Sequence, residues 1–347
     1  MHNIEPAGLA AVGTTWDQPE RPEASGGPSL SGTTVLNPLQ QYVADDLLGI
    51  GQERPTADLT WAPELRAWLD ESLQEHIPLV GQRQLWVTKR AMAGALGCEA
   101  RHLATQDDFE WSREIAKGVV VHHAVALVAA GSMADPLDLA NSGLDEARDK
   151  GGQSLRSWLN DLTEQQRLAL VSAAVAEIDA FMAAFPPIEA GWNPVAEFPV
   201  RTTVGGGKVR LSGRVDLALG SPRPGPDHAV RRERLLLEIK SGRPQPEHRI
   251  EHLTYALFEL LRSGIAPFRA ATYYTASSTW VADDITLDLL FLAGKRLIDA
   301  TKRLIELSAG RAPERRPGWR CGYCPMAKAC PESEVVSDTA EDSDDDG

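Results

Sequence analysis

Apolar and polar positions follow two distinct periods along the chain, and these periods predict its secondary structure. Apolar residues recur every three to four positions, as in amphipathic helices, over several segments. These predicted helices span 37–48, 61–75, 88–95, 111–130, 154–185 with a break near 161, 247–262 and 283–309. Strand patterns occupy 190–204, 208–219, 234–241 and 268–275, and 85–87 is either a short strand or the start of a helix. We interpret 135–152 as a loop with one short helix. This order predicts an α/β fold, with a helical N-terminal region and a central mixed sheet of about four or five strands flanked by helices.

Composition divides the chain into one domain and two tails. Residues 1–35 are rich in Gly, Pro, Ser and Thr. We expect 1–55 to be a largely disordered extension that carries a short docking helix at 37–48. Residues 332–347 hold eight acidic residues and no Lys or Arg, which predicts a disordered acidic tail. The remaining segment, 56–331, is long enough to bury a full core and predicts one domain.

The net charge of −14 lies almost entirely in the tails. Residues 332–347 contribute −8 and residues 1–55 contribute −5, so 56–331 carry about −1. A nearly neutral domain can still carry a local basic groove for phosphates, so nucleic acid is not excluded as a partner. No apolar run approaches the ~20 residues of a membrane helix. The N-terminus also lacks a basic segment followed by an apolar core. We therefore expect a cytoplasmic protein without a membrane partner.

Charged residues interrupt two of the predicted strands. Asp216 lies in the strand that begins at Lys208, and Glu238 and Lys240 lie in the strand at 234–241. Glu238 and Lys240 project to the same face because side chains alternate along a strand. Charges in an apolar strand are costly to bury unless they are paired or bind a metal. The three residues therefore indicate either an ion pair on an edge strand or a site for a hard divalent cation, which prefers oxygen ligands.

The spacing D-x21-E-x-K from Asp216 to Lys240 resembles the PD-(D/E)XK nuclease superfamily, with Val215 where many members have proline. The resemblance implies a restriction-endonuclease-like core that binds Mg²⁺ or Mn²⁺. It implies that Asp216, Glu238 and Lys240 are catalytic, with Lys240 positioning the attacking water. The carbonyl of Ile239 would join the carboxylates as a metal ligand.

Two further motifs resemble the RecB-like branch of that superfamily. Gly118 and His122 form G-x-x-x-H in an apolar segment, and a histidine there is either a packed core residue or, by the resemblance, a metal ligand. His122 is preferred over its neighbour His123. The branch also has Q-x-x-x-Y on a later helix, where this chain has Glu251 and Tyr255. The resemblance implies that Tyr255, Glu251 and Arg243 bind substrate. Three arginines (Arg231, Arg232 and Arg234) form either a solvated patch or a contact to the DNA backbone.

The chain has four cysteines, and three of them are closely spaced. Cys321, Cys324 and Cys330 form C-x2-C-x5-C, and Cys98 lies 222 intervening residues upstream. Four thiolates can hold a [4Fe–4S] cluster or a zinc ion, and disulfides are improbable in a cytosolic protein. The pattern resembles the iron–sulfur staple of RecB-like nucleases of the AddB type and of the CRISPR-associated exonuclease. This resemblance implies a [4Fe–4S] cluster that closes the domain, with Zn²⁺ as the alternative.

The order of these motifs along the chain agrees with the RecB-like pattern over about 98–331. It implies a metal-dependent deoxyribonuclease that acts as an exonuclease on single-stranded ends in DNA repair, recombination or defence. The alternative is a non-cleaving iron–sulfur DNA-binding or scaffold subunit of a helicase–nuclease or CRISPR adaptation complex. RNA also stays open as the substrate. The chain has no G-x4-G-K-[ST] phosphate loop, so any unwinding would come from a partner helicase.

Overall fold

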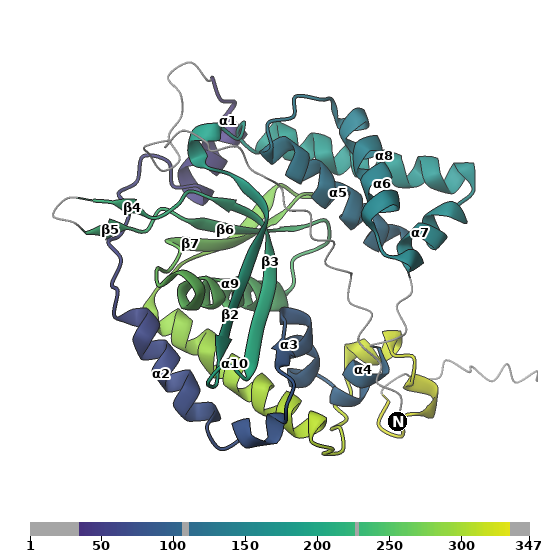
Figure 1. The fold of residues 1–347 in the computed structure, drawn as a ribbon. Helices are drawn as coiled ribbons and strands as arrows, with labels where there is room; N and C mark the ends of the chain where they lie inside the picture. The colour runs from purple at the N-terminus through teal and green to yellow at the C-terminus, as the bar shows by residue number, and fades with distance from the viewer. Residues whose placement is uncertain (1–34, 106–110, 226–228, 334–347) are drawn as a thin grey trace, which may run out of the picture.

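Helices surround a twisted sheet in the computed structural model, which describes residues 35–105, 111–225 and 229–333 (Figure 1). The α-helices are α1 (Pro38–Tyr42), α2 (Trp61–Leu73), α3 (Lys89–Leu96), α4 (Glu99–Ala104), α5 (Arg113–Ala129), α6 (Pro136–Lys150), α7 (Gln153–Asn160), α8 (Glu164–Ala184), α9 (Pro246–Ser263) and α10 (Leu287–Ser308). The strands are β1 (Leu85–Val87), β2 (Val195–Val204), β3 (Val209–Leu219), β4 (Arg223–Pro224), β5 (Val230–Arg231), β6 (Leu235–Lys240), β7 (Arg269–Tyr274) and β8 (Thr279–Asp284). Short π and 3₁₀ turns are η1 (Val43–Leu47), η2 (Ile77–Val80), η3 (Ala190–Trp192), η5 (Trp319–Tyr323) and η6 (Ala327–Ala329). No helix in the described ranges is long and apolar enough to cross a membrane.

The main sheet is mixed, which confirms the predicted fold class. Its strand order is β1-β3-β6-β7-β8. Strands β1 and β6 pair with different stretches of the same edge of β3, and β2 pairs along the opposite edge. The β1–β3 and β6–β7 pairs are parallel, and the remaining pairs are antiparallel. Strand β3 pairs with β1 through Val209–Leu211 and with β6 through Leu217–Leu219. Between these two ladders the sheet forks, and this fork holds Asp216.

Two helical layers cover the two faces of the sheet. Helices α5, α6, α7 and α8 pack with Leu237, Ile239 and Tyr273 into one core, and α2, α3, α9 and α10 pack with Leu236 and Ala270 into the other. In Figure 1 the first layer lies at the upper right, whereas α9 and α10 lie behind β2 and β3. Adjacent residues of β6 therefore enter opposite cores, as the predicted alternation requires.

Most of the segment 135–152, for which the sequence pattern predicts a loop with one short helix, forms the 15-residue helix α6 (Pro136–Lys150). Asp135 caps its N-terminus by accepting a hydrogen bond from the Asp138 amide, and Pro136 occupies the first turn. Gly143, within this helix, allows close packing against α5. A Cβ there would lie 2.7 Å from the carbonyl oxygen of Val120.

Three other segments also differ from the sequence-based prediction. Strand β8 was not predicted and occupies part of the interval before α10, and α4 was not predicted either. Residues 35–55 were assigned to a largely disordered extension with a short docking helix at 37–48. The helix is confirmed by α1 and η1, but the segment is ordered, and Val43 and Leu47 are fully buried in the α5–α8 core. The guanidinium of Arg269 donates to the carbonyls of Asp46 and Leu47 and ties this segment to β7. The disorder expected for 1–34 and 334–347 lies outside the described residues.

Candidate active site and cysteine pocket

The fork between β1 and β6 sets the position of Asp216. Its side chain is 15% exposed, and its Oδ2 accepts a 2.7 Å hydrogen bond from the backbone amide of Ile239. The pairing of β3 with β6 ends at Leu217 and Leu237, so the Ile239 amide has no carbonyl of β3 opposite it. The Asp216 carboxylate accepts its hydrogen bond instead. N–H and C=O of one strand residue point to the same side, so the Ile239 carbonyl also faces the fork.

His122 reaches the fork from α5, the helix that crosses the sheet at this point. Its Nδ1 lies 3.2 Å from Oδ1 of Asp216. Gly118, one turn earlier, faces Ser241, whose Oγ would lie 3.1 Å from a Cβ at that position. His123 points away, and its Nδ1 lies 3.6 Å from a carboxylate oxygen of Glu146 on α6. The structure thus brings His122, and not His123, to the predicted catalytic carboxylate.

Glu197 joins this group and was not predicted. The β2–β3 register pairs Ala196 with Leu217 and Phe198 with Val215, so Glu197 lies opposite Asp216. Glu197 has a positive φ of 53°, a strained conformation for a non-glycine residue. Ligand atoms of His122, Glu197 and Asp216 all lie within 4.8 Å of one another. The predicted strands at 190–204 and 208–219 would pair Val204 with Lys208, which places Glu197 opposite Val215. The observed register pairs Val204 with Val209, so the sequence alone does not identify this partner.

Glu238 is held by two lysines. Its side chain is only 1% exposed, and its Oε2 lies 2.6 Å from the Nζ of Lys89 and 3.4 Å from that of Lys240. Glu251 on α9 completes the array, because its Oε2 lies 2.8 Å from Lys240 and 3.4 Å from Lys89. The other oxygen of Glu238, Oε1, is buried without a hydrogen-bond partner among the described residues. Lys89, at the start of α3, was not predicted.

The charges in the fork shift one another's pKa values. Burial opposes charge on Asp216, but His122 and the Ile239 amide lower the pKa of this carboxyl to about 2. Burial and the neighbouring Asp216 raise the pKa of Glu238. Burial opposes charge on Lys89 as well, yet Glu238 and its other acidic neighbours raise the pKa of this amine well above its usual value. The site therefore keeps closely spaced opposite charges in a largely buried setting.

The donor set suits a hard divalent cation. Asp216 and Glu197 offer carboxylate oxygens, His122 offers an imidazole nitrogen, and the unpartnered Oε1 of Glu238 is a buried acceptor without a donor. A buried acceptor of this kind is costly unless something satisfies it. These residues, with the Ile239 carbonyl, are the groups that would hold Mg²⁺ or Mn²⁺.

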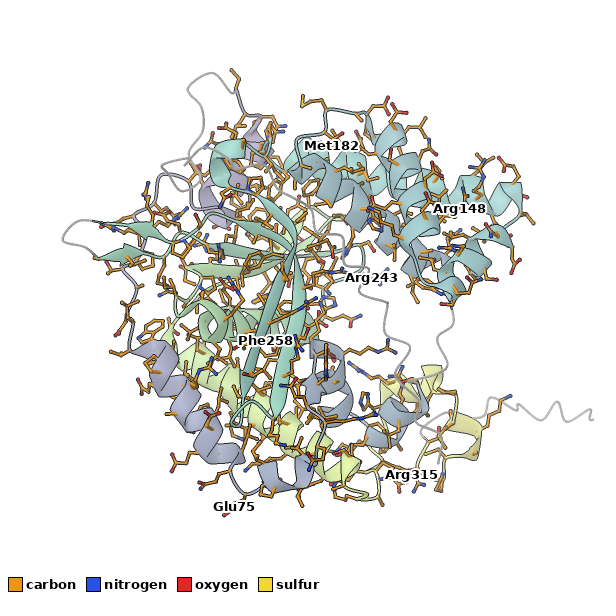
Figure 2. All side chains as sticks on the ribbon, in the orientation of Figure 1. Glu75, Arg148, Met182, Arg243, Phe258 and Arg315 are labelled. Atoms are coloured by element: carbon orange, nitrogen blue, oxygen red, sulfur yellow. The ribbon has the colours of Figure 1, made fainter. Side chains whose placement is uncertain are left out.

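Of the three residues predicted to bind substrate, two lie at the fork. The ring of Tyr255 lies under the ammonium of Lys89, 5.0 Å from its centroid, and is only 2% exposed. Burial raises the pKa of this phenol. A Cβ on Gly213 would lie 2.2 Å from the Tyr255 ring, so a glycine on β3 makes room for it. Glu251 pairs with Lys240, as described above. Arg243 is exposed just after β6 (Figure 2).

The arginines that follow the loop at 220–229 serve the fold. The Arg232 side chain is buried and donates to the carbonyls of Ala266, Pro267 and Ile285. Arg234 pairs with the buried Glu259. Arg231 donates to Glu53 and to the carbonyl of Arg54. Arg232 and Arg234 are thus internal contacts of the fold and not a solvated patch, whereas Arg231 is 24% exposed beside Glu53.

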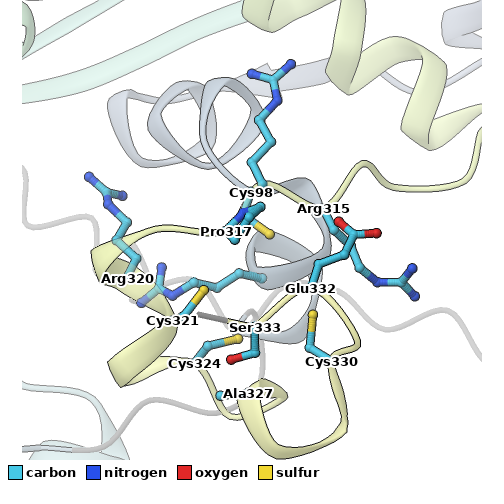
Figure 3. A pocket seen from close by; sticks show the side chains of 12 residues that line it. Cys98, Arg315, Pro317, Arg320, Cys321, Cys324, Ala327, Cys330, Glu332 and Ser333 are labelled. Carbon is cyan, nitrogen blue, oxygen red and sulfur yellow. The ribbon is translucent and has the colours of Figure 1, made fainter. Parts of the chain in front are cut away.

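The four cysteines line one pocket, although Cys98 is far from the others in sequence (Figure 3). All four are half-buried free thiols. Arginines surround them: Arg101, Arg315, Arg316 and Arg320 line the same pocket. A set of thiol donors without disulfides suits either an iron–sulfur cluster or zinc.

Hydrogen bonds beside Cys98 hold the two ends of the domain together. The carboxylate of Glu99 is fully buried and accepts from Arg303 at 3.1 Å, from Arg311 at 2.7 Å and from the Glu314 amide at 2.8 Å. The Ala100 amide donates to the Glu314 carbonyl at 3.2 Å. These contacts join the start of α4 to the segment that follows α10.

Comparison with known protein families matches residues 90–331, more than half of the chain, to the PD-(D/E)XK nuclease superfamily. The chain belongs to this superfamily. The matched range contains the fork and all four cysteines. No curated protein matches the sequence. Among solved structures, one described as "Crystal structure of SSO0001" is similar, with 14% sequence identity, 76% of this chain and 93% of that chain covered, and a TM-score of 0.32.

Proposed function

We propose that this PD-(D/E)XK protein is a Mg²⁺- or Mn²⁺-dependent deoxyribonuclease that acts as an exonuclease on single-stranded DNA ends. The observation that carries the proposal is the convergence of Asp216, Glu238 and Lys240 with His122 in one fork of the sheet. The buried Oε1 of Glu238 has no donor there, and a scaffold protein would have no use for such a costly acceptor. The preference for DNA, single strands and ends rests on the RecB-like order of motifs.

Each residue of the fork has a distinct role in this proposal. His122, Glu197, Asp216 and Glu238, with the Ile239 carbonyl, are the ligands of the cation. A divalent cation at this site supplies Lewis-acid charge to a phosphate and lowers the pKa of a bound water. Lys240 orients the attacking water, and Glu251 holds its ammonium in place at 2.8 Å.

Groups around the fork support these residues. Lys89 fixes the Glu238 carboxylate through Oε2, which leaves Oε1 free for the cation. Tyr255 packs beneath Lys89, and it would limit the space open to the substrate. Arg243, exposed just after β6, would contact a phosphate of the strand.

We further propose that Cys98, Cys321, Cys324 and Cys330 hold a [4Fe–4S] cluster, with Zn²⁺ as the alternative. Their shared pocket supports this assignment. Cys330→Ala is expected to lose the bound iron and to lower the melting temperature, measured on anaerobically purified protein together with its absorption near 400 nm. Unchanged iron content and melting in Cys330→Ala would rule out the cluster, and one zinc per chain would select the alternative.

The function is tested with end-labelled single- and double-stranded DNA and with RNA of the same sequence, in Mg²⁺ or Mn²⁺. Cleavage should be lost in Asp216→Ala and in Lys240→Ala, whereas circular dichroism and melting of these variants should show a retained fold. Full activity in both variants would refute the site. DNA binding without cleavage by the parent protein would favour the scaffold subunit of a helicase–nuclease or CRISPR adaptation complex.

A further inference from the structure

The β2–β3 arm has one buried face and one open face. Beyond the fork, Val200 and Val204 of β2 and Val209 and Leu211 of β3 are buried against the α9–α10 layer. Figure 1 shows this arm passing in front of α9 and α10. Leu217 and Leu219 of β3 belong to the α5–α8 core, and His122 of α5 contacts Asp216. The second face of the arm is thus polar and contains half-buried and exposed residues in the described structure.

Basic and aromatic side chains share this open face. Arg210 lies opposite Thr203, Ser212 opposite Arg201 and Arg214 opposite Pro199. Cross-strand partners project to the same face of a sheet. Trp86 of the edge strand β1 is in register with Arg210. We call Trp86, Arg201, Arg210 and Arg214 the basic face.

Trp86 is unusual because it is large, apolar and 56% exposed on a short edge strand. The guanidinium of Arg210 lies 4.7 Å from the centroid of its ring. This contact covers one side of the indole and fixes its orientation. The measured exposure leaves room for a second flat group on the ring. An exposed, oriented aromatic beside a cation is the arrangement on which proteins stack the bases of single strands.

The basic face leads directly into the fork. Arg214, whose side chain is 64% exposed, pairs with Glu197, a member of the candidate metal group. Arg210 and Asp216 are six positions apart on β3, which corresponds to about 20 Å at the rise of a strand. At about 3.4 Å per stacked nucleotide, and about twice that when extended, roughly three to six nucleotides span this distance. The arm can therefore guide a strand from Trp86 to the site.

We propose that the basic face binds a single-stranded nucleic acid and delivers it to the fork, an inference that deepens the proposed nuclease function. A base stacks on Trp86, and Arg201, Arg210 and Arg214 contact successive phosphates. A duplex is disfavoured as the ligand of Trp86, because its bases are stacked on one another and offer the ring no free face.

The test measures binding of fluorescent oligothymidylate of about 20 nucleotides by the full-length chain, in a Lys240→Ala background that prevents cleavage. Trp86→Ala should weaken binding about tenfold, as expected for the loss of one stacked base, and Trp86→Phe should retain most of the affinity. Arg210→Ala and Arg214→Ala should each reduce the slope of log K against log [salt] by about 0.7, the value for one phosphate of a single strand. Oligouridylate should show the same losses, because neither contact uses the 2′-hydroxyl.

The matched control is Lys295→Ala, which removes a 69% exposed cation on α10, in the layer behind the sheet. It should leave both affinity and salt dependence unchanged. Parental binding by Trp86→Ala and by Arg210→Ala would overturn the proposal, as would a loss seen only with duplex.

A second readout is cleavage by chains with the native Lys240. Trp86→Ala should raise KM for long strands with little change in kcat. If the parent does not cleave at all, the nuclease proposal fails while the binding result still decides the basic face.

Discussion

The ammonium of Lys89 lies in the fork beside the carboxylates of Glu238 and Glu251, so its positive charge balances theirs. This ammonium lies 2.6 Å from the buried Oε2 of Glu238 and 5.0 Å from the Tyr255 ring centroid. Lys89→Met removes this charge while keeping the chain length. Glu238 would then turn toward Lys240 and lose its fixed orientation. We expect cleavage to fall about 10- to 100-fold, as for other residues that orient a metal ligand, with a weaker affinity for Mn²⁺ measured by calorimetry.

Lys89→Arg provides the control for this prediction, because it keeps a cation beside Glu238. It should recover part of the activity and most of the Mn²⁺ affinity. If Lys89→Met bound Mn²⁺ and cleaved DNA as well as the parent, Lys89 would have only a packing role.

Gly213 determines whether the Tyr255 ring can pack against β3. A methyl group there would meet the ring at 2.2 Å, so the ring or the strand must move. Gly213→Ala should lower the free energy of unfolding by about 1–3 kcal/mol, the usual cost of overpacking a core, as measured by urea denaturation. Gly191→Ala is the control, because its Cβ would meet no atom within 4 Å. Equal stability of the two variants would contradict this account.

The sequence predicted some residues of the fork and missed others for a definite reason. Asp216, Glu238 and Lys240 stand out because they interrupt apolar strands. Glu197 also interrupts apolar residues, between Ala196 and Phe198, but it belongs to none of the recognised motifs, and only the pairing of β2 with β3 places it at Asp216. The role of Lys89 also depends on the fold, because its partner Glu238 is 149 positions away along the chain.

At the scale of elements, one carboxylate locks the edge strand β8 to α9. Asp283 accepts from Nε2 of His252 at 2.9 Å and forms a two-pronged contact with Arg249, with a shortest distance of 2.6 Å. Burial opposes its charge, but His252 and Arg249 hold the pKa of Asp283 well below its usual range. The folded-state pKa is thus depressed. The resulting stability is present above about pH 4, the pKa in the unfolded chain, and is lost as the pH falls further.

Asp283→Asn should therefore lower the free energy of unfolding by about 1.5–3 kcal/mol at pH 7, the range for hydrogen bonds to a charged group. The difference from the parent should shrink as the pH falls from about 4 toward 2. Urea denaturation across this range measures it. Asp149→Asn changes an exposed carboxylate on α6 and should show neither effect. A difference that stays constant with pH would mean that the charge of Asp283 does not stabilise the fold.

The secondary structure of segments with a clear apolar period was predicted well. Elements whose formation depends on packing or pairing with other elements were not predicted. The segments at 61–75, 247–262 and 208–219 correspond to α2, α9 and β3. Helix α2 buries the regular face of Leu65, Leu69 and Leu73, whereas α9 is buried on all sides over 252–261. Helix α6 contains a glycine that serves close packing, which the sequence alone cannot distinguish from a loop signal. Strand β8 is a polar edge strand whose partner, β7, supplies the pairing.

For the whole molecule, the order of the motifs predicted that the two ends of the domain meet, and the four cysteines do line one pocket. No sequence motif predicts the second connection beside this pocket. Glu99 is an ordinary acidic residue in sequence, yet it is fully buried and accepts one hydrogen bond from Arg303 on α10 and two from Arg311 and the Glu314 amide in the segment after α10. This connection consists of hydrogen bonds and ion pairs, so we expect it to hold Cys98 beside the other three cysteines without a bound metal.

Glu99→Gln keeps the shape of this side chain and removes its charge, so it separates the two connections. Arg303 and Arg311 would lose a buried partner, and the free energy of unfolding should fall by about 2 kcal/mol, less than for a fully buried pair because both arginines are partly exposed. The fall should appear in protein stripped of metal by a chelator as well as in protein as purified. Glu306→Gln is the matched control, since Glu306 also pairs with Arg311 but is 36% exposed. Its cost should stay below about 1 kcal/mol. A loss confined to the metal-loaded Glu99→Gln protein would instead mean that Glu99 acts only through the cysteine site, and that the domain ends are joined by the metal alone.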